Sequence, residues 1–462
     1  MISSQPLRFL RSALDETGKC IPTDEVLRWL EWRNREVEVD VVRTRLSKMR
    51  DWAMDETDGR IRHSSGKFFS IDGIRVRTNW GNKPEWAQPI INQPEIGLLG
   101  CIAREICGTL HFLIQAKVEP GNVNCVQLSP TLQATKSNYT RVHQGKIPKY
   151  LDWFFDRSRS RVLLDQLQSE QGARFLHKRN RNVVVETDGD VPADPDFVWL
   201  TLGQIKRLMA FDNVVNMDLR TVVSGIPFGS APPNAKASGF AEAMRDSALD
   251  SIHGLHSLDD LISWFTGQKV RFDLQVSRCN LRSIEDWTLT DEALSHVDNQ
   301  FFKVVWVDVR IGNREVSEWQ QPLVEPAREG ILAFVVKRIR GVYHFLVQAK
   351  LECGNFDVLE FAPTVQCITG SYANSLKILP YLEYVLTARP DQIRSDTLQS
   401  EEGGRFYREQ NRNLIVEADD DFPVECPENY QWMTLNQLLT FVRFNNYLNI
   451  QARSLLASLR FA

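Results

Sequence analysis

Residues 108–135, GTLHFLIQAKVEPGNVNCVQLSPTLQAT, occur a second time in the chain in a related form, and this repeat indicates how the fold is organised. Residues 341–368, GVYHFLVQAKLECGNFDVLEFAPTVQCI, align with it without gaps, with 13 identities in 28 positions at an offset of 233 residues. A second block, LQSEQGARFLHKRNRN at 167–182, matches LQSEEGGRFYREQNRN at 398–413 in 10 of 16 positions at an offset of 231. Both offsets are close to half of the 462 residues, so we predict one domain that has been duplicated.

The segment between the copies, SGIPFGSAPPNAKASGFAEAMRDS at 224–247, is rich in Gly, Pro, Ser and Ala. This composition is typical of a linker or an extended connection. We therefore predict a first copy at 1–223, a linker at 224–247 and a second copy at 248–462.

The spacing of apolar residues predicts helices at the ends of each copy and strands between them. The expected helices are 23–34, capped by Thr23, then 163–175, and those that open at Thr201 and Thr434; the expected strands include 67–77 and 110–118. Strands and helices do not alternate regularly, so we expect an α+β fold in which each copy is a mixed β-sheet with flanking helices.

The composition is that of a globular protein with a large core, since 43% of the residues are hydrophobic and 25% are charged. Lys and Arg number 55 against 59 Asp and Glu, a net charge of -4 that lacks the basic excess of a nucleic-acid binder. No apolar run approaches the roughly 20 residues that span a bilayer. The eight cysteines form no CxxC pair, so we expect reduced, mostly buried thiols in a cytoplasmic protein.

The predicted strand at 110–118 places polar side chains on one face, because side chains alternate along a strand. Leu110, Phe112 and Ile114 should face the core. The opposite face carries the same four polar residues in both copies: His111, Gln115, Lys117 and Glu119 in the first, and His344, Gln348, Lys350 and Glu352 in the second. Exposed residues need no fixed identities, so we interpret this face as a pocket wall rather than as the solvent face of a half-exposed sheet.

Neutral hydrogen-bonding residues follow this strand in both copies. They are Asn122, Ser129, Thr131, Gln133, Ser137, Asn138 and Tyr139 in the first copy, and Asn355, Thr364, Gln366 and Tyr372 in the second. Groups of this type bind sugar hydroxyls or the edge of a pyrimidine ring. The alternative is that the Ser, Thr and Asn side chains cap loops.

The predicted helix at 163–175 spaces Glu170 and Arg174 four residues apart on one face. The pair is either a surface ion pair or part of a binding site. Arginine is suited to hold a diphosphate because its guanidinium is a planar fork, and Lys178, Arg179 and Arg181 follow closely. The second copy has Glu401, Arg405, Asn411 and Arg412 at the positions of Glu170, Arg174, Asn180 and Arg181.

Several chemistries lack their sequence motifs. The chain contains no GxGxxG after a strand, no GxxxxGK[ST], no GxSxG and no HExxH. A dinucleotide fold, a P-loop, a redox cofactor and bound zinc are therefore not indicated.

Long stretches of the chain closely resemble the NDP-hexose 2,3-dehydratases of deoxysugar biosynthesis. The stretches are IRHSSGKFFSIDG at 61–73, QPIINQPEIGLLG at 88–100, residues 110–139 and 163–182, and NMDLRTVVSG at 216–225. The resemblance implies a homodimer of tandem Nudix-like domains that acts on dTDP-4-keto-6-deoxyglucose or a close relative, without metal or organic cofactor. It also implies two nucleotide-sugar pockets per subunit, one of them a vestige of the duplication, and a 3-ketoreductase as the downstream partner.

One departure from the wider Nudix pattern concerns the metal-binding REUXEE helix. The corresponding segments read LQSEQGARF and LQSEEGGRF, without the cluster of carboxylates that holds magnesium. Hydrolysis of the diphosphate is therefore disfavoured.

The implied reaction removes the proton at sugar carbon 3, which the 4-keto group acidifies, and expels the hydroxyl at carbon 2 to give a 3,4-diketo sugar nucleotide. It needs a base, donors at the carbonyl oxygen and an acid for the departing hydroxyl. We predict Glu119 or Glu170 as the base, Lys117 with Gln115 at the enolate, and Tyr139 or His63 as the acid. Arg174 and Arg181 are predicted at the diphosphate and Trp86 or Phe69 on thymine. The other polar residues named above, with Asn180, are expected to bind the substrate.

The two copies differ at the predicted site. Lys178 and Arg179 of the first copy become Glu409 and Gln410, which should weaken anion binding in the second copy. We therefore expect catalysis in the first copy. Two alternatives remain open, a noncatalytic nucleotide-sugar binding protein and a Nudix-type pyrophosphohydrolase.

Overall fold

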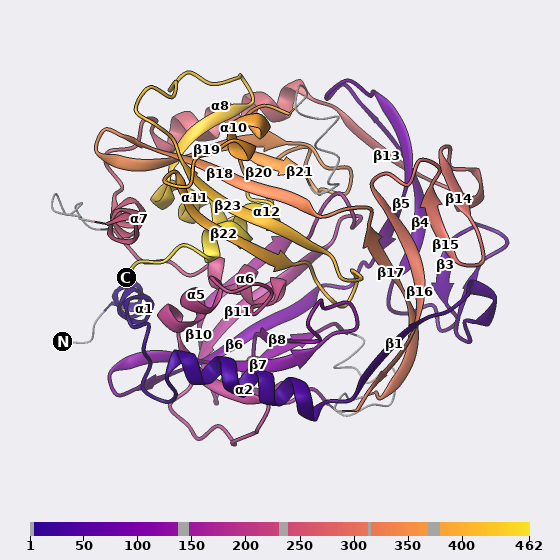
Figure 1. Ribbon diagram of the computed structural model, residues 1–462, viewed down its shortest axis with the longest axis horizontal. Helices are drawn as coiled ribbons and strands as arrows, with labels where there is room; N and C mark the ends of the chain where they lie inside the picture. Colours follow the sequence, from indigo (N-terminus) through magenta and orange to yellow (C-terminus); the bar gives the residue numbers. More distant parts are fainter. Residues whose placement is uncertain (1–3, 137–146, 231–238, 313–315, 368–378) are drawn as a thin grey trace.

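The computed structural model describes residues 4–136, 147–230, 239–312, 316–367 and 379–462. Within these ranges the chain forms the expected α+β fold, and the same order of elements occurs twice (Figure 1).

The first copy holds these elements: α1 (Gln5–Leu14), α2 (Thr23–Glu36), β1 (Val39–Arg43), β2 (Trp52–Met54), β3 (Ile61–His63), β4 (Ser70–Thr78), β5 (Glu85–Asn92), β6 (Gly97–Ile106), β7 (Thr109–Val118), β8 (Val126–Ser129), β9 (Leu132–Ala134), α4 (Asp152–Phe155), β10 (Arg161–Ser169), β11 (Arg179–Glu186), β12 (Phe197–Thr201), α5 (Leu202–Leu208) and α6 (Met217–Ser224).

The second copy holds these elements: α7 (Phe240–Leu249), α8 (Leu258–Arg271), β13 (Leu274–Cys279), β14 (Trp287–Leu289), β15 (Ala293–His296), β16 (Phe302–Ile311), β17 (Glu318–Pro326), β18 (Gly330–Ile339), β19 (Val342–Lys350), β20 (Glu360–Ala362), β21 (Val365–Cys367), α10 (Leu382–Leu386), β22 (Ile393–Ser400), β23 (Gln410–Glu417), β24 (Tyr430–Thr434), α11 (Leu435–Val442) and α12 (Ile450–Ala457).

Each copy builds a mixed core sheet with the same topology. In the described part of the first copy the strand order is β10-β11-β6-β7-β12, with β8 on β7 and β9 on β6. The second copy repeats this as β22-β23-β18-β19-β24, with β20 on β19 and β21 on β18. Only one neighbouring pair in each described sheet, β11/β6 or β23/β18, is parallel. The shared topology confirms the duplication predicted from the sequence.

Two smaller sheets each combine strands of both copies. β13 of the second copy pairs with β4 of the first, and β1 of the first copy pairs with β16 of the second. These sheets lie to one side of the core sheets (Figure 1). Each copy therefore lends an edge strand to the other, which joins the halves beyond their shared core.

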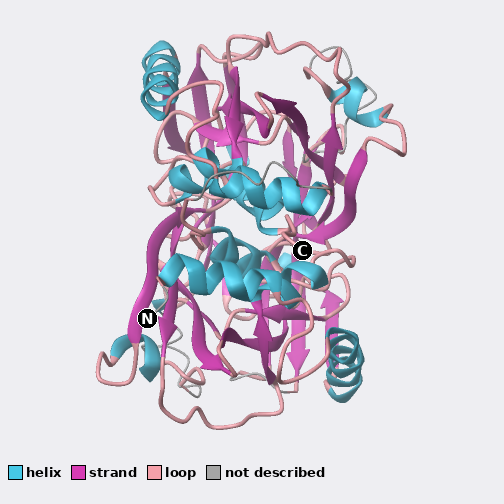
Figure 2. Ribbon diagram, turned by 90° about the vertical axis from the view of Figure 1, so that its left-hand side faces the viewer, coloured by secondary structure: helices cyan, strands magenta, loops and turns pink. Residues whose placement is uncertain are grey.

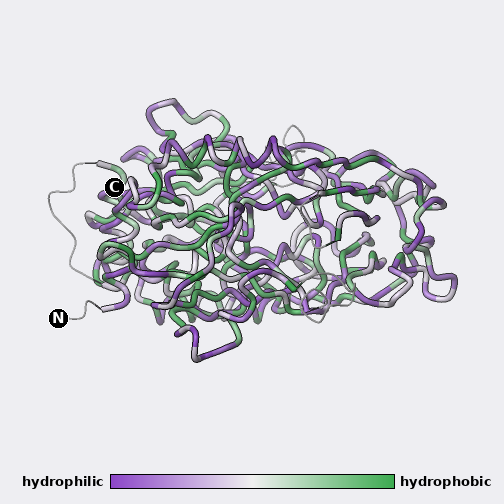
Figure 3. The backbone as a smooth tube through the Cα atoms, turned by 90° about the horizontal axis from the view of Figure 1, so that it is seen from below, coloured by the Kyte–Doolittle hydropathy of each residue, from purple (hydrophilic) through white to green (hydrophobic). Residues whose placement is uncertain are grey.

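The hydrophobic core is continuous across the duplication. One cluster of buried residues includes Phe112, Leu128 and Leu219 of the first copy together with Phe345 and Leu455 of the second. Helices α6 and α12 pack against each other between the two core sheets (Figure 2). In Figure 3, the hydrophobic segments run through the middle of this part of the molecule, and its outer loops are mostly hydrophilic.

The helices predicted at Thr201 and Thr434 are confirmed. Each threonine accepts a hydrogen bond from the backbone of the third helical residue, Gln204 or Gln437, whose side chain bonds back to complete a capping box. The helix predicted at 23–34 is confirmed as α2, but its cap is wrong, because the Thr23 hydroxyl donates to the carbonyl of Glu16 instead.

The helix predicted at 163–175 is wrong. Residues up to Ser169 belong to strand β10, which pairs with β11 from Arg161 opposite Glu186 to Ser169 opposite Arg179. A loop then runs to Lys178. Glu170 and Arg174 are therefore not neighbours on a helix face, and their spacing of four residues has no helical meaning.

The predicted boundaries between the copies stay a prediction. Of the segment 224–247, residues 231–238 lie outside the described ranges, and helix α7 begins at Phe240. All eight cysteines are free thiols, but the expectation that most are buried is wrong, because only Cys101, Cys353 and Cys367 are buried. Among the helices described, none has the length and apolar character needed to cross a membrane.

Candidate active site

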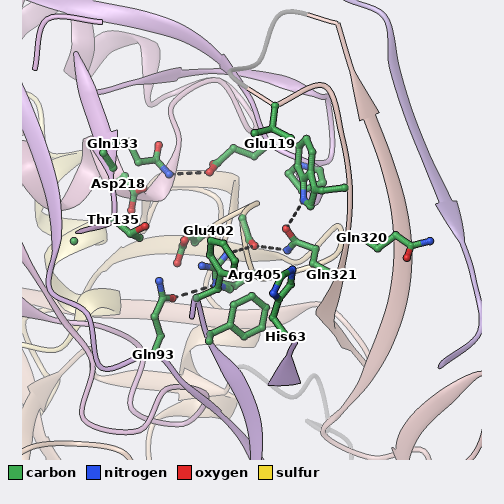
Figure 4. Close-up of a pocket in the computed structure, with 18 of the residues that line it drawn as sticks. His63, Gln93, Glu119, Gln133, Thr135, Asp218, Gln320, Gln321, Glu402 and Arg405 are labelled. Carbon is green, nitrogen blue, oxygen red and sulfur yellow. Dashed lines mark hydrogen bonds between the residues drawn. The ribbon is translucent and has the colours of Figure 1, made fainter. Parts of the chain in front are cut away.

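A cavity of about 470 Å³ lies where the two copies meet (Figure 4). The first copy contributes the end of β7, strand β9, helix α6 and the small sheet that carries His63. The second copy contributes strand β17 and the loop that follows β22. The cavity therefore depends on both halves of the chain.

In the part of the chain that the structure describes, five carboxyl groups line this cavity: the exposed Asp51 and Glu318, and the less accessible Glu119, Asp218 and Glu402. Gln133 donates a hydrogen bond to Oε1 of Glu119 at 2.7 Å, while Oε2 of Glu119 is buried without a partner among the described residues. Oδ1 of Asp218 is also buried and unpartnered within the described chain. Buried carboxylate oxygens of this kind are costly unless a ligand binds to them, so they point to a substrate site.

Helix α6 places Asp218 in the cavity. Asn216 caps this helix by accepting a hydrogen bond from the backbone of Leu219 at 2.9 Å. The Nδ2 of Asn216 also donates to Oε1 of Gln133 at 3.3 Å. One polar chain therefore runs from the helix cap through Gln133 to Glu119, and it fixes Asp218 and Glu119 relative to each other.

Burial changes the protonation of these acids. Burial raises the pKa of Asp218 well above its usual range, and the negative charge of Glu402 raises it further. Burial also raises the pKa of Glu402 itself. Behind the cavity wall, burial and then the charge of Glu402 raise the pKa of Glu170 to about 8. Burial therefore favours the protonated form of these carboxyl groups, which is the form that a general acid requires.

Lys117, Lys178 and Arg405 also line the cavity, and the exposed Arg50 lies at its edge as a fourth cation. The Nζ of Lys117 donates to the carbonyl of Gln133 at 3.1 Å, and that of Lys178 donates to the carbonyl of Glu95. Burial lowers the pKa of both Lys178 and Arg405, and the nearby carboxylates oppose this shift. Positive charge is thus available both for an anionic substrate and for a developing enolate.

Aromatic rings form another part of the wall. The Trp52 ring lies 4.8 Å from Phe69 and 5.5 Å from His63, measured between ring centroids. Trp319 donates to Gln321 at 2.8 Å, and Gln321 donates to the carbonyl of Gly404 at 2.8 Å. Burial lowers the pKa of His63, which favours the neutral ring at pH 7.

Arg405 lies between the aromatic and the carboxyl parts of the cavity (Figure 4). Its guanidinium carbon is 4.2 Å from the centre of the Phe69 ring, and its Nε donates to Oε1 of Gln93 at 3.1 Å. Arg405 was predicted for the second-copy pocket, but the loop after β22 places it in the first-copy cavity.

The two copies exchange these loops symmetrically. The N–H of Gly121 donates to the carbonyl of Gly403 at 2.7 Å, and the N–H of Gly354 donates to the carbonyl of Gly172 at 2.7 Å. A Cβ on Gly121 would lie 1.6 Å from the carbonyl oxygen of Phe406, so only glycine fits this approach. Each loop tip therefore completes the site of the other copy.

Arg174 lies on the loop after β10, which reaches the second-copy site, and so it does not lie in the first-copy cavity. Its guanidinium lies 4.1 Å from the centre of the Phe302 ring, and Glu409, Glu352 and Glu401 are the carboxyls that act on it electrostatically. The predicted diphosphate role of Arg174 stays untested, but the structure places its guanidinium outside the cavity that holds Glu119. Glu170 is also not a cavity residue, since it is buried behind Asn180, which donates to it at 2.7 Å.

Only the end of the predicted polar stripe reaches the cavity. The structure brings together Lys117, Glu119, Gln133, Asn180, His63 and Phe69 of the predicted site residues around it. His111 does not line it, because its ring is fully buried between the carbonyl of Thr109 and the N–H of Lys19. Gln115 lies opposite Ser129 and Phe197 in the sheet, also away from the cavity.

The neutral residues after the strand serve structural roles. Thr131 donates to the carbonyl of Leu113 and accepts from the N–H of Ile102. These bonds to the backbone match the alternative that the Ser, Thr and Asn side chains cap loops. Ser129 bonds Gln133 from behind at 3.0 Å, and Asn122 bonds the carbonyl of Cys125 at 2.9 Å. These three do not line the cavity, and their contacts favour the capping alternative over direct substrate binding. Ser137, Asn138 and Tyr139 lie outside the described residues.

Arg181 and Trp86, which were also predicted to bind the substrate, lie outside the cavity. Arg181 forms an ion pair with Asp165 at 2.5 Å on the surface side of β11. Trp86 bonds Gln88 at 2.9 Å, and the cavity instead receives Trp319, its counterpart in the second copy. The exchange of parts between the copies explains this difference.

The second-copy residues form a related cluster without the same chemistry. Gln366 donates to Glu352 at 2.8 Å and Asn411 donates to Glu401 at 2.6 Å, as their first-copy counterparts do. Gln451 stands in place of Asp218, Gln171 in place of Glu402 and Glu409 in place of Lys178. This site therefore lacks two of the acids and one of the cations of the cavity.

The other second-copy predictions repeat the structural roles seen in the first copy. Thr364 bonds the carbonyl of Leu346, Gln348 bonds that of Pro363 at 2.8 Å, and His344 accepts from the N–H of Leu255 at 2.9 Å. Arg412 pairs with Asp396 at 2.6 Å. Asn355 packs against Gly172, Lys350 ends β19, and Tyr372 lies outside the described residues.

Sequence reasoning missed Asp218, Glu402 and Trp319. A signal for the first two was present, because both are carboxyls that become amides in the other copy, as Gln451 and Gln171. Asp218 also lies in the stretch 216–225. In the described ranges, no group of three or more His, Cys, Asp or Glu residues is arranged to hold a metal ion.

Comparison with known proteins gives full-length matches. The sequence model of the family described as NDP-hexose 2,3-dehydratase matches residues 23–226 and again 258–459. A protein of Saccharopolyspora spinosa, named dTDP-4-dehydro-6-deoxy-alpha-D-glucopyranose 2,3-dehydratase, is 46% identical over 99% of this chain and 95% of its own. Proteins of the same name from Streptomyces violaceoruber and Amycolatopsis orientalis are 43% and 41% identical, over 94% and 98% of this chain and 96% and 94% of their own.

Proposed function

The chain belongs to the NDP-hexose 2,3-dehydratase family, and from this we propose that it eliminates water from dTDP-4-keto-6-deoxyglucose, also called the 4-dehydro sugar nucleotide, across sugar carbons 2 and 3. It is a lyase of deoxysugar biosynthesis. One observation supports this function most strongly: the cavity combines a carboxyl oxygen of Glu119 that has no partner among the described residues, carboxyls whose pKa is raised by burial, and several cations. These are the groups that the reaction needs.

Glu119 is the base in this proposal. Its buried Oε2 has no partner among the described residues, while Gln133 holds its other oxygen in place. It removes the proton at carbon 3, and the electron pair of that bond forms an enolate towards the carbonyl at carbon 4. Lys117, which is held at the carbonyl of Gln133, stabilises the charge on the enolate oxygen. Glu170 is dropped as a base because Asn180 separates it from the cavity.

Asp218 and Glu402 supply the acid. The enolate expels the hydroxyl at carbon 2, which takes a proton from this pair of carboxyls and leaves as water. A double bond then joins carbons 2 and 3, and the carbonyl at carbon 4 is restored. The enol at carbon 3 tautomerises to a ketone, which gives the 3,4-diketo sugar nucleotide. Two neighbouring carboxyls in a buried site are suited to hold one proton between them.

Arg405 is the diphosphate ligand in this proposal. A dTDP-sugar carries its diphosphate between the base and the sugar, and Arg405 lies between the aromatic and the carboxyl parts of the cavity. Trp52, Phe69 and Trp319 then provide surfaces for the thymine ring, as the family resemblance implies.

The first-copy cavity is the catalytic site in this proposal, since the second site replaces Asp218 and Glu402 by amides. We also propose that each copy is Nudix-like, that the protein is a homodimer, and that a 3-ketoreductase consumes the product. The family resemblance supports these points, and gel filtration tests the homodimer. The proposed division at 224–247 is supported by the gap between the two family matches.

The test is incubation of the protein with dTDP-4-keto-6-deoxyglucose, with and without a chelator, followed by mass spectrometry. We expect loss of one water from the intact sugar nucleotide, trapped by a coupled 3-ketoreductase. Magnesium-dependent release of a sugar phosphate would indicate the pyrophosphohydrolase instead. Binding of the sugar nucleotide without formation of any product would indicate a noncatalytic nucleotide-sugar binding protein.

A further inference from the structure

Two arginines lie at the centre of the molecule, one in each copy of the last helix. Arg220 is in α6 and Arg453 is in α12, and their exposed fractions are 1% and 0%. Both bind backbone carbonyls and neutral side chains of the opposite copy. Burial of a guanidinium is costly, so each arginine must stabilise a specific arrangement.

Arg220 joins helix α6 to strand β22 of the second copy. Its Nη2 donates to the carbonyl of Ser400 at 2.5 Å, and its Nη1 donates to Oε1 of Gln399 at 3.0 Å. Its Nε donates to Oγ of Ser454 at 2.8 Å. These bonds fix the first-copy helix against the last residues of β22.

Each end of this connection carries one acid of the cavity. Asp218 precedes Arg220 by two residues in α6, and Glu402 follows Ser400 by two residues in the chain. The far end of the same loop has its own anchors, because Tyr407 bonds Val324 at 2.7 Å and Arg408 bonds Gly121 at 2.7 Å through the backbone. Arg220 therefore controls the end of the loop that bears Glu402, and Arg405 is anchored separately.

We propose that Arg220 is a positioning residue that sets Glu402 of the second copy against Asp218 of the first, so that the two carboxyls share the proton given to the departing hydroxyl. The inference rests on the proposed function and adds a residue that touches no substrate. It acts through the backbone of Ser400, with a second restraint from the Ser400 hydroxyl, which donates to Gln127 at 2.8 Å.

Arg453 provides a matched control within the same chain. Its Nε donates to Oγ1 of Thr221 at 3.1 Å and its Nη2 donates to the carbonyl of Ser169. The loop after Ser169 brings Gln171 to the second-copy site, where Gln451 occupies the position of Asp218. Arg453 thus makes equivalent bonds, but the two residues it would align are amides that hold no acidic proton.

The experiment compares Arg220→Met with Arg453→Met in the full chain, using dTDP-4-keto-6-deoxyglucose in D₂O. It measures Tm, KM, the rate of water loss, and deuterium at carbon 3 of unreacted substrate. We expect a similar fall in Tm for both variants. Arg220→Met should lose at least 30-fold in kcat with KM within 3-fold, while its substrate still gains deuterium because Glu119 is undisturbed. Arg453→Met should keep kcat within 3-fold.

Arg220→Lys and Arg453→Lys form a milder pair for the case in which a Met variant does not fold. We expect Arg220→Lys to lose about 5-fold in kcat, since an ammonium can still donate to Ser400, and Arg453→Lys to keep the parent rate. Equal losses in both members of a pair, or loss of carbon 3 exchange together with water loss in Arg220→Met, would overturn the inference. The parent protein in the same assay tests the proposed function separately, because a parent that loses no water refutes the function itself.

Discussion

At the level of single residues, the two copies differ most in their carboxyl groups, and Asp218 is the first example. Its counterpart, Gln451, has nearly the same place in the last helix but cannot release a proton. Glu402 and its counterpart Gln171 differ in the same way. The duplication has therefore kept a carboxyl at the position proposed for the base in both copies, Glu119 and Glu352, while only the first-copy site holds the carboxyls proposed as the acid.

Replacement of Asp218 by Asn tests the acid. We expect Asp218→Asn to lower kcat by about 10²-fold, because an amide cannot protonate the departing hydroxyl. Exchange of deuterium at carbon 3 should continue, since Glu119 is unchanged, and mass spectrometry of unreacted substrate measures it. Gln451→Asn is the control and should keep the parent rate. Parallel loss of exchange and of water elimination in Asp218→Asn would argue against its role as the acid.

The buried carboxyl of Glu170 should make the free energy of unfolding depend on pH. Its pKa is raised to about 8 by burial and then by Glu402, so the native state keeps a proton that the unfolded chain releases near pH 4.5. Between these values the native state binds more protons, and the free energy of unfolding falls as the pH rises. The contribution is at most about 1.4 kcal/mol per pH unit.

Glu170→Gln removes this proton equilibrium. We expect the difference between the Tm of Glu170→Gln and the Tm of the parent to increase as the pH rises from 6 to 8. Calorimetry in matched buffers measures it. Asp165→Asn, a change at a surface ion pair, should show the same pH dependence as the parent. Parallel curves for Glu170→Gln and the parent would show that Glu170 is ionised throughout.

Among the secondary-structure elements, the two exchanged loops decide which residues reach which site. The loop after β10 brings Gln171 and Arg174 to the second site, and the loop after β22 brings Glu402 and Arg405 to the first. The close backbone contact of Gly121 with the second loop holds this exchange in place.

Gly121→Ala tests the contact between the loops. Its Cβ would lie 1.6 Å from the carbonyl oxygen of Phe406, and backbone cannot rotate away as a side chain can. We expect a loss of about 1 to 3 kcal/mol in the free energy of unfolding, with reduced kcat. Gly267→Ala, in helix α8 with no atom within 4 Å of its Cβ, should instead gain up to about 1 kcal/mol. Denaturant unfolding measures both, and an unaffected Gly121→Ala would contradict the contact.

Local sequence patterns predicted the strands better than the loops. Strand β7 and the capping boxes at Thr201 and Thr434 were predictable, because alternation and capping are local properties. The segment 163–175 misled the prediction, since its strand partner β11 lies beyond a loop that periodicity does not reveal. His111 shows the other limit: its identity is kept in both copies for a structural hydrogen bond rather than for substrate.

The two copies form one folding unit at the scale of the whole molecule. Buried residues of both copies share one hydrophobic cluster, and each small sheet takes a strand from the other copy. The duplication and the α+β class were predictable from the repeat. The exchange was not, because a repeat in sequence does not reveal which copy completes which site.

Separate expression of residues 1–226 tests this unity. We expect this half alone to lack a cooperative thermal transition and to show no turnover, because it leaves core surface exposed and has no Arg405 or Glu402. Coexpression with residues 239–462 should restore both properties. A first half that alone turns over substrate within about 10-fold of the parent would contradict the shared cavity; circular dichroism and the dehydratase assay provide the data.

We propose that dehydration takes place in the first-copy cavity and that Glu119 begins it by removing the proton at carbon 3. The most direct measurement compares Glu119→Gln with Glu352→Gln on dTDP-4-keto-6-deoxyglucose in D₂O. We predict that Glu119→Gln loses about 10²- to 10⁴-fold in kcat together with deuterium uptake at carbon 3, while Glu352→Gln stays within 3-fold of the parent. Carbon 3 exchange that persists in Glu119→Gln, or that disappears in Glu352→Gln, would contradict the account.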